Sequence, residues 1–433
     1  MHDLPGVLAR LQTLRSKFEA LLASARRKAV RARDDRPTRL RELAGFGANP
    51  GNLRMFAYAP EQLRPNAPLV IALHGCTQTA AEYDSGTGWS FIADRLGFAV
   101  VYPQQQPANN PKSCFSWFLP GDMTRGHGEA LSIKEMVEHA IRTFGAERSK
   151  VFVTGLSAGG AMASVMLATY PELFAGGAII AGLPYGCARN VQQAFEAMFA
   201  EEGDPAQWLG DRVRAASRYR GPWPKISVWH GTSDPIVKPS NGEAIIRQWI
   251  NVHGLSEVHS YEELIGSHTR RVWSDAKGDA LIEAFSINGM AHGVPLRTTT
   301  GEESCGAGGA FFLDVGISST HHIARFWGLH KFLVEKQRVA ALMPAPCAML
   351  YDEGNSVIPR ARPETVHVST EDVSTQCDER EAQYALNPND VIAAAFQAAG
   401  LPDLPKASPG AGLRVEPGPI IAAALKAAGL ARN

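Results

Sequence analysis

The sequence KVFVTGLSAGGAMAS, residues 150–164, predicts a strand, a tight turn and a helix in that order. It begins as an apolar, β-branched run, turns through Gly155-Leu156-Ser157-Ala158-Gly159 and continues in small residues that suit a helix. A serine at such a turn is exposed only if its neighbours are small, because larger side chains would collide with the following helix. The stretch therefore predicts a nucleophilic Ser157 in an α/β fold, with an incidental serine in a glycine-rich turn as the alternative.

Apolar segments with strand character lie on both sides of this stretch and alternate with helical segments. This alternation is typical of a mostly parallel sheet flanked by helices. The expected strands cover 52–60, 68–75, 98–104, 175–182, 225–231 and 280–287, and the expected helices cover 88–97, 129–145, 241–254 and 318–333.

The chain divides into three predicted regions. Residues 1–44 are expected to form a basic amphipathic helix, 45–340 an α/β catalytic domain, and 341–433 a flexible tail. A helical, mixed-charge insert at 183–224 interrupts the domain and could cap the carboxyl edge of the sheet. The N-terminal helix either docks on an anionic surface or packs on the chain's own core, and we favour packing.

The tail carries an internal repeat. VIAAAFQAAGL (391–401) and IIAAALKAAGL (420–430) are identical at eight of eleven positions. Each predicts a short helix that ends at glycine. The two helices either dock on a partner or pack on the body of the protein, and the polar linkers slightly favour docking.

Charge and hydropathy exclude some classes of protein. Lys+Arg and Asp+Glu number 43 each, so the zero net charge argues against a nucleic-acid-binding protein. No apolar run is long enough for a transmembrane helix. The N-terminus lacks the apolar run of a secretory signal, which predicts a cytoplasmic protein with mostly reduced cysteines, although export by another route stays open.

A serine nucleophile needs a general base and an acid that orients the base. Asp234 follows the strand at 225–231, in VWHGTSDPIV, and His292 follows the strand at 280–287, in FSINGMAHGVP. Both loops lie at the carboxyl edge, where such sheets assemble their sites. Asp234 could instead cap a turn, and the nearby His230 could be a core histidine. The other histidines fall on the final helix or follow no predicted strand: His127, His253, His259, His268, His321 and His322.

The loop in IALHGCTQTA (71–80) is the candidate oxyanion hole. We expect the backbone N–H groups of Cys76 and Ala158 to stabilise a developing oxyanion. His74 is expected to hold this loop by hydrogen bonds. Metal-ligand spacing, a phosphate loop and a cofactor fingerprint are all absent from the sequence, which predicts no cofactor and no metal.

Several motifs, in order, resemble the polyhydroxybutyrate depolymerase family of esterases, which is related to the feruloyl and acetylxylan esterases of carbohydrate esterase family one. The resemblance covers about residues 45–335 and implies an α/β-hydrolase with Ser157, Asp234 and His292 as its triad and the Cys76 backbone in its oxyanion hole. The motifs are LHGCTQTA, GTGWS, CFSWF, GEALSIKEMV, TGLSAGGAMASVMLATYP, IIAGLPYGCA, VWHGTSD and ISSTHHIARFWG.

The resemblance also leaves alternatives open. Cysteines that match Cys76 and Cys114 could pair in extracellular relatives, whereas here both could be buried free thiols. Trp89 and Trp117 either bind substrate at the rim of the site or belong to the core.

The resemblance implies a serine esterase that forms an acyl-enzyme on short-chain hydroxyalkanoate esters or oligomers. An amorphous granule reached through the C-terminal helices is a further possible substrate, since the sequence shows no separate polymer-binding module. The alternatives are a feruloyl or acetyl esterase acting on plant polysaccharide, and a granule-associated binding protein with a vestigial site.

Overall fold

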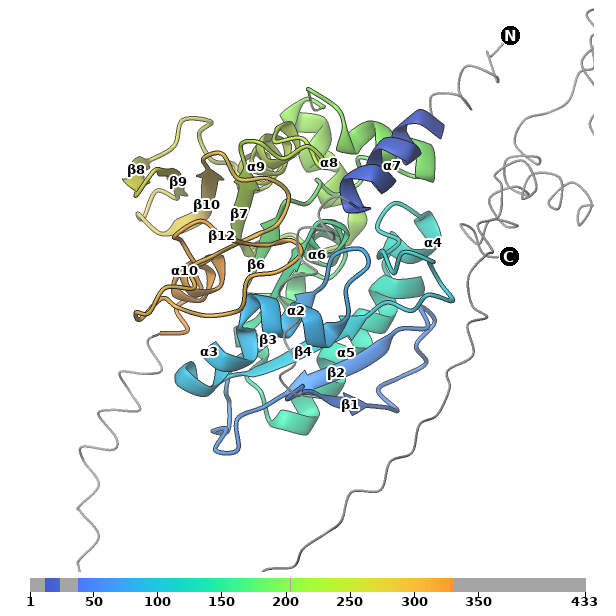
Figure 1. The fold of residues 1–433 in the computed structure, drawn as a ribbon, viewed down its shortest axis with the longest axis vertical. Coiled ribbons are helices and arrows are strands. Elements are labelled where there is room, and N and C mark those ends of the chain that lie inside the picture. Colours follow the sequence, from blue (N-terminus) through green and yellow to red (C-terminus); the bar gives the residue numbers. More distant parts are fainter. Residues whose placement is uncertain (1–11, 24–37, 203, 331–433) are drawn as a thin grey trace, which may run out of the picture. The chain divides into compact units, whose positions relative to one another are not determined.

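The computed structural model describes residues 12–23, 38–202 and 204–330 (Figure 1). The chain separates into two units, Met1–Lys336 and Gln337–Asn433, and all described residues belong to the first. The predicted tail at 341–433, with both of its repeats, lies outside the described residues. In the part of the chain that is described, no helix is both long and apolar enough to span a bilayer.

A ten-stranded sheet forms the centre of the domain, with strand order β1-β2-β4-β3-β5-β6-β7-β10-β9-β8. The neighbours from β4 to β10 in this order are parallel, and the two strands at each end are antiparallel. The prediction of a mostly parallel sheet is therefore confirmed. The strands are β1 (Arg41–Leu43), β2 (Arg54–Tyr58), β3 (Leu69–Leu73), β4 (Ala99–Gln104), β5 (Val151–Leu156), β6 (Gly176–Ile180), β7 (Lys225–Gly231), β8 (Tyr261–Ile265), β9 (His268–Ser274) and β10 (Ala280–Ile287). A second, two-stranded sheet pairs β11 (Val294–Leu296) with β12 (Phe312–Asp314).

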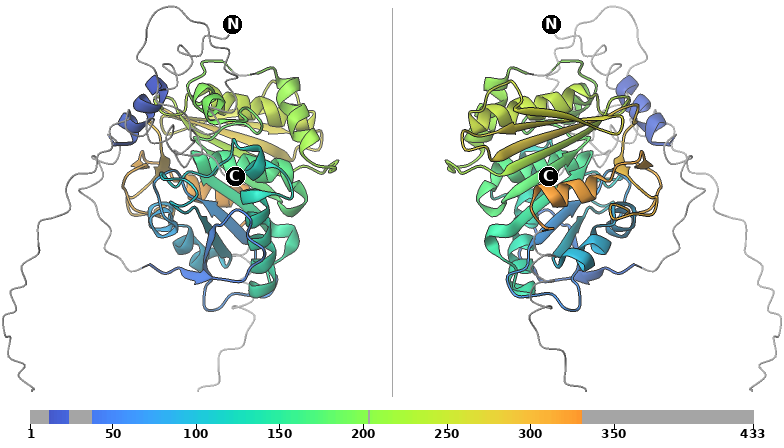
Figure 2. Two further views of the ribbon diagram at one scale, coloured as in Figure 1. Left: turned by 90° about the vertical axis from the view of Figure 1, so that its right-hand side faces the viewer. Right: turned by 90° about the vertical axis from the view of Figure 1, so that its left-hand side faces the viewer.

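Helices flank the sheet, with α5 on one side and α10 on the other (Figure 2). This arrangement explains why β3, β5 and β6 are buried along their whole length, as their apolar sequences predict. The helices are α2 (Ala80–Thr87), α3 (Trp89–Leu96), α4 (Pro120–Met123), α5 (Gly128–Phe144), α6 (Ala158–Thr169), α7 (Val191–Met198), α8 (Ala206–Ala216), α9 (Ser240–His253) and α10 (Ser319–Phe326), and another helix covers 12–23.

The N-terminal helix at 12–23 packs on the insert of its own chain, which is the alternative that we favoured. The Phe18 ring lies edge-on to Phe195 of α7, with 5.6 Å between ring centroids. The Lys17 ammonium lies 4.8 Å from the centre of the Phe199 ring. The predicted boundary at residue 44 needs one correction, because residues 41–43 form β1 and pair with β2.

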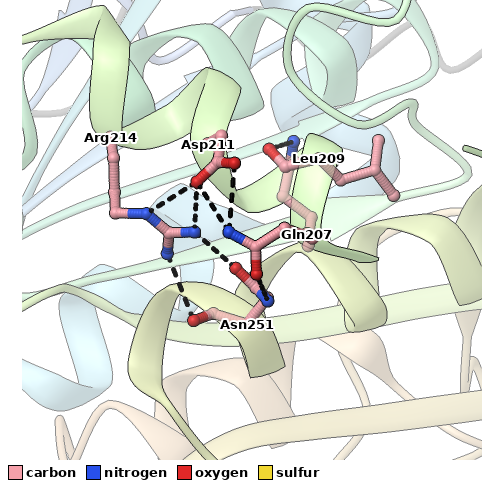
Figure 3. A network of polar contacts seen from close by, with 6 residues as sticks. Gln207, Leu209, Asp211, Arg214 and Asn251 are labelled. Carbon is pink, nitrogen blue, oxygen red and sulfur yellow. Dashed lines mark hydrogen bonds and ion pairs between the residues drawn. The ribbon is translucent and has the colours of Figure 1, made fainter. Parts of the chain in front are cut away.

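The insert at 183–224 is helical, as predicted, and is fixed to the loop and helix that follow β7. Figure 3 shows α8 bound to α9: Arg214 donates hydrogen bonds to the backbone oxygen and to Oδ1 of Asn251, at 3.2 and 2.6 Å. At the end of α7, the Met198 carbonyl accepts a hydrogen bond of 2.9 Å from the Lys238 amide. Lys238 lies four residues after Asp234, so the end of α7 contacts the loop that carries the predicted acid.

Candidate active site

The turn after β5 holds Ser157 in a strained backbone conformation. Its φ of 57° and ψ of −117° lie outside the backbone regions that residues other than glycine usually adopt. The two glycines make this possible. A Cβ at Gly155 would lie 2.3 Å from the Gly159 carbonyl oxygen, and one at Gly159 would lie 2.3 Å from the Leu73 oxygen. The predicted strand, turn and helix are confirmed, and Ser157 stands where α6 begins.

Asp234 and His292 are joined by a short hydrogen bond between buried side chains. His292 Nδ1 lies 2.7 Å from Asp234 Oδ2. The other carboxylate oxygen, Oδ1, accepts from the amides of Ile236 and Val237 at 2.8 and 2.9 Å. The carboxylate is therefore fixed by the backbone on one side and orients the imidazole on the other.

Two histidines act on the ionisation of Asp234. Burial alone would raise the pKa of this carboxyl, but the nearby His292, together with hydrogen bonds from His230 and His292, lowers it below its ordinary value. His230 Nε2 lies 2.9 Å from the Val237 oxygen and 3.4 Å from Asp234 Oδ2. His230 is thus a buried core histidine, which is the alternative given for it in the sequence, and it also contacts Asp234. Asp234 is therefore held as a carboxylate next to the His292 ring.

Ser157 lies at the same edge of the sheet as this pair. The strands β5, β6, β7 and β10 are consecutive neighbours, and Ser157, Asp234 and His292 follow the carboxyl ends of the first, third and fourth. Backbone hydrogen bonds join the loops there, including the one of 2.9 Å from the Ser157 amide to the Ile180 oxygen. Among the contacts of the described residues, Ser157 Oγ and His292 share no hydrogen bond.

The loop after β3 leaves one amide available. Among the described contacts, the Cys76 N–H has no protein acceptor, whereas the other amides of residues 75–80 all donate hydrogen bonds. Their acceptors are Gln78 Oε1 for Gly75, the Lys112 oxygen for Thr77, the Gly75 oxygen for Gln78, Glu82 Oε2 for Thr79 and Gln104 Oε1 for Ala80. This loop lies against the start of α6, because a Cβ at Gly159 would be 2.5 Å from the His74 oxygen. The free Cys76 amide and the α6 N-terminus are therefore close neighbours.

His74 holds the loop through both ring nitrogens, as predicted. Nε2 accepts a hydrogen bond of 3.0 Å from the Gln105 amide, so Nδ1 carries the proton and donates to the Gly75 oxygen at 2.7 Å. Complete burial lowers the pKa of His74 to about 4. The imidazole is neutral at physiological pH, which suits a structural role.

This ionisation predicts acid sensitivity. The unfolded chain takes up a proton at His74 below a pH of about 6.5, whereas the folded protein resists protonation down to about 4. Stability should therefore fall as the pH drops through this window. Thermal unfolding at pH 7 and pH 4.5 should show a smaller decrease in Tm for His74→Gln than for the wild type. An equal decrease in both proteins would contradict this contribution.

The structure contains a disulfide between Cys76 and Cys114. The alternative of two buried free thiols is therefore wrong for this pair. Cys187 and Cys305 are free thiols, while Cys347 and Cys377 lie outside the described residues. The disulfide ties the candidate oxyanion loop to the segment at 112–118.

The expectation that Trp89 binds substrate is wrong. Its side chain is 1% exposed and stacks on Trp327, with ring centroids 5.8 Å apart. Trp327 in turn stacks on Phe152, near the amino end of β5 and so at the opposite edge from Ser157. Trp89 belongs to the core. Trp117 is mostly buried against Phe118 but lies in the segment bound to Cys76, so its contact with substrate stays a prediction.

A pocket of about 630 Å³ opens beside the acid. Its lining comes from the loop after β7 and the end of the insert, and includes Asp234, Lys238 and Glu201. The Lys238 ammonium lies 3.0 Å from a Glu201 carboxylate oxygen, so an ion pair forms part of the lining. The insert therefore shapes the surroundings of the site, as its predicted position suggests.

Sequence reasoning missed the polar residues that support the site, above all Gln105 and Glu129. Both are buried, and they bind each other at 2.6 Å. The available signal was their position: Gln105 directly follows a buried strand, and Glu129 begins a helix inside a motif, GEALSIKEMV, used for the resemblance.

The chain is similar in sequence and in fold to known esterases. The family described as Esterase PHB depolymerase matches residues 56–267. Poly(3-hydroxyalkanoate) depolymerase C of Paucimonas lemoignei is 48% identical over 292 residues, which cover 67% of this chain and 70% of the relative. An acetylxylan esterase of Coprinopsis cinerea is 37% identical over 60% of this chain and 70% of its own length. A solved acetyl xylan esterase from Aspergillus awamori superposes with a TM-score of 0.58 at 26% identity, covering 67% of this chain and 99% of that one. The chain therefore belongs to the PHB depolymerase family of esterases, and it is a carboxylic ester hydrolase with the α/β-hydrolase fold.

Proposed function

We propose that this esterase uses Ser157 as nucleophile, His292 as general base and Asp234 as the orienting acid. The observation that carries the proposal is the 2.7 Å hydrogen bond between Asp234 and His292, at the sheet edge where the strained turn presents Ser157. The carboxylate keeps the proton on Nδ1 of the imidazole, so that Nε2 can accept the serine proton.

The reaction then follows from these positions. Ser157 Oγ attacks the ester carbonyl carbon as its proton passes to His292, and the carbonyl oxygen becomes an oxyanion. The free Cys76 amide and the Ala158 amide at the start of α6 are the proposed donors to that oxyanion. His292 returns the proton to the departing alcohol, which leaves an acyl group on Ser157. Water, activated by His292, attacks this acyl-enzyme and releases the acid.

For the substrate, we propose short-chain hydroxyalkanoate esters or oligomers. The relative from Paucimonas lemoignei, at 48% identity, supports this class. The acetylxylan and feruloyl esterases, at 31–37% identity, support a second candidate, an acetyl or feruloyl ester of plant polysaccharide. Docking on a granule through the C-terminal helices stays a prediction, because those helices lie outside the described residues.

A hydrolysis panel on the purified full chain tests the substrate class. The panel comprises hydroxybutyrate oligomers, amorphous hydroxybutyrate granules, p-nitrophenyl esters of increasing length, methyl ferulate and acetylated xylan. We expect the highest kcat/KM on hydroxybutyrate oligomers or short p-nitrophenyl esters. Turnover of methyl ferulate or acetylxylan without turnover of hydroxybutyrate oligomers would favour the second candidate instead.

A cytoplasmic location also stays a proposal. The Cys76–Cys114 disulfide counts against it, because disulfides persist mainly in oxidising compartments. Fractionation of the native host, with an antibody against the protein, would decide between a cytoplasmic location and an oxidising compartment.

A further inference from the structure

The segment at 112–118 is bound to the oxyanion loop at several points. The Cys76–Cys114 disulfide is one of them, and the hydrogen bond of 2.6 Å from the Thr77 amide to the Lys112 oxygen is another. One contact is made by Cys76 itself and the other by its neighbour Thr77, so both lie next to the free Cys76 amide. The position of the Cys76 amide therefore depends on the position of residues 112–118.

Gln105 connects this segment to the other end of the loop. Its amide donates to His74 Nε2 at 3.0 Å, and its side-chain nitrogen donates to the Cys114 oxygen at 3.2 Å. The same nitrogen also donates to Glu129 Oε1 at 2.6 Å. Gln105 is 1% exposed, so water does not compete for these bonds.

Glu129 completes the connection from the first turn of α5. It is 0% exposed, and its second oxygen accepts a hydrogen bond of 2.8 Å from the Ser116 amide. Burial and the nearby Asp122 raise the pKa of Glu129 to about 8. A buried carboxyl is costly to retain. Here one oxygen binds the Gln105 side chain and the other binds the Ser116 amide, and both of these groups support the oxyanion loop.

We propose that Glu129 is a positioning residue for the oxyanion hole. Through Gln105 and Ser116 it fixes residues 112–118, and through them and His74 it sets the position of the Cys76 amide. This inference rests on the assignment of that amide in the proposed function. Glu129 itself acts at a distance and touches neither the nucleophile nor the loop amide.

The test is the variant Glu129→Gln. Both carboxyl oxygens accept from N–H groups, and the amide nitrogen of glutamine cannot accept, so one of these hydrogen bonds is lost. Removing an oxyanion donor typically costs about 10²–10³ in kcat, and displacing one should cost less. For p-nitrophenyl butyrate we expect kcat to fall about 10- to 100-fold, with KM unchanged. A kcat equal to that of the wild type would overturn the proposal.

Glu283→Gln is the matched control. Glu283 is also a fully buried carboxyl, bound to Ser227 and Arg270 on the other half of the sheet. It should lower Tm and leave kcat unchanged. If both variants lost kcat in the same proportion, Glu129 would have only a general structural role. Should Glu129→Gln fail to fold, Gln105→Met removes the same link without changing the Glu129 carboxyl, and it should show the same loss of kcat at constant KM.

A double-mutant cycle with Cys114→Ala adds an independent readout. Because the disulfide and Glu129 hold the same segment, their combined effect on kcat should be smaller than the product of the two separate effects. A combined loss equal to the product would overturn the shared role. The inference fails separately from the proposed function: an active Ser157→Ala variant would refute the function, whereas an inactive Ser157→Ala with a fully active Glu129→Gln would refute the inference alone.

Discussion

Replacing Ser157 with alanine should lower kcat for p-nitrophenyl butyrate by at least about 10⁴-fold, because the variant lacks the proposed nucleophile and cannot form the acyl-enzyme at that position. The variant removes one oxygen at the strained turn and leaves the Gly155 and Gly159 packing in place. Substrate binding should therefore persist. The measurements are steady-state hydrolysis, and labelling by a fluorophosphonate probe, which should disappear.

Ser164→Ala is the control for this prediction. Ser164 lies on the same helix and donates a buried hydrogen bond of 2.8 Å to the Leu183 oxygen. Its loss should lower Tm and leave turnover intact. If the Ser157→Ala protein kept a tenth or more of the wild-type rate, the assignment of the nucleophile would be wrong.

Asp234→Asn should lower kcat by about 10³- to 10⁴-fold while the protein remains folded. The backbone amides of Ile236 and Val237 will hold the asparagine oxygen in the place of Oδ1, since both are donors. The side-chain nitrogen must then face His292 Nδ1. That contact forces Nδ1 to accept, so the proton moves to Nε2 and the base is lost at the atom that should take the serine proton.

Steady-state hydrolysis and thermal unfolding together check this outcome. Asp211→Asn provides the control, because Asp211 is also an acid but lies on α8 of the insert. Its partners there are Arg214 and Gln207. It should retain full activity. A kcat within tenfold of the wild type for Asp234→Asn, with an ordinary Tm, would mean that another acid orients His292.

The central strands could be predicted because their sequences carry the signal. A strand buried on both faces needs a continuous apolar run, and VFVTGL at β5 is such a run. Position along the chain then indicated Asp234 and His292, because each follows the end of a buried strand. The contact between them is the part of the candidate site that sequence reasoning anticipated best.

The hairpin of β8 and β9 was missed, and its stabilisation explains why. Its strands read YEELI and HTRRVWS, with too many charges for a buried run. Arg270 pairs there with Glu263 at 2.8 Å and with the buried Glu283 at 2.9 Å. These ion pairs join residues of three strands, and no local pattern reveals them.

Trp89 shows a second limit of sequence reasoning. Its ring stacks on Trp327, which lies far along the chain. The disulfide has the same character, since it joins a loop after β3 to a segment after β4. In both cases the decisive partner is set by tertiary structure.

The close approach of α6 to the end of β3 has a consequence for engineering the enzyme. A Cβ at Gly159 would lie 2.3 Å from the Leu73 oxygen and 2.5 Å from the His74 oxygen, so the proposed nucleophile and the loop that holds Cys76 are anchored to the same close contact. A substitution at Gly159 would shift the Ser157 turn and the Cys76 loop together, and would lower the turnover of every ester substrate. Libraries that aim to change the preferred ester should instead vary the insert at 183–224 and the positions around Lys238 and Glu201, which line the pocket beside Asp234.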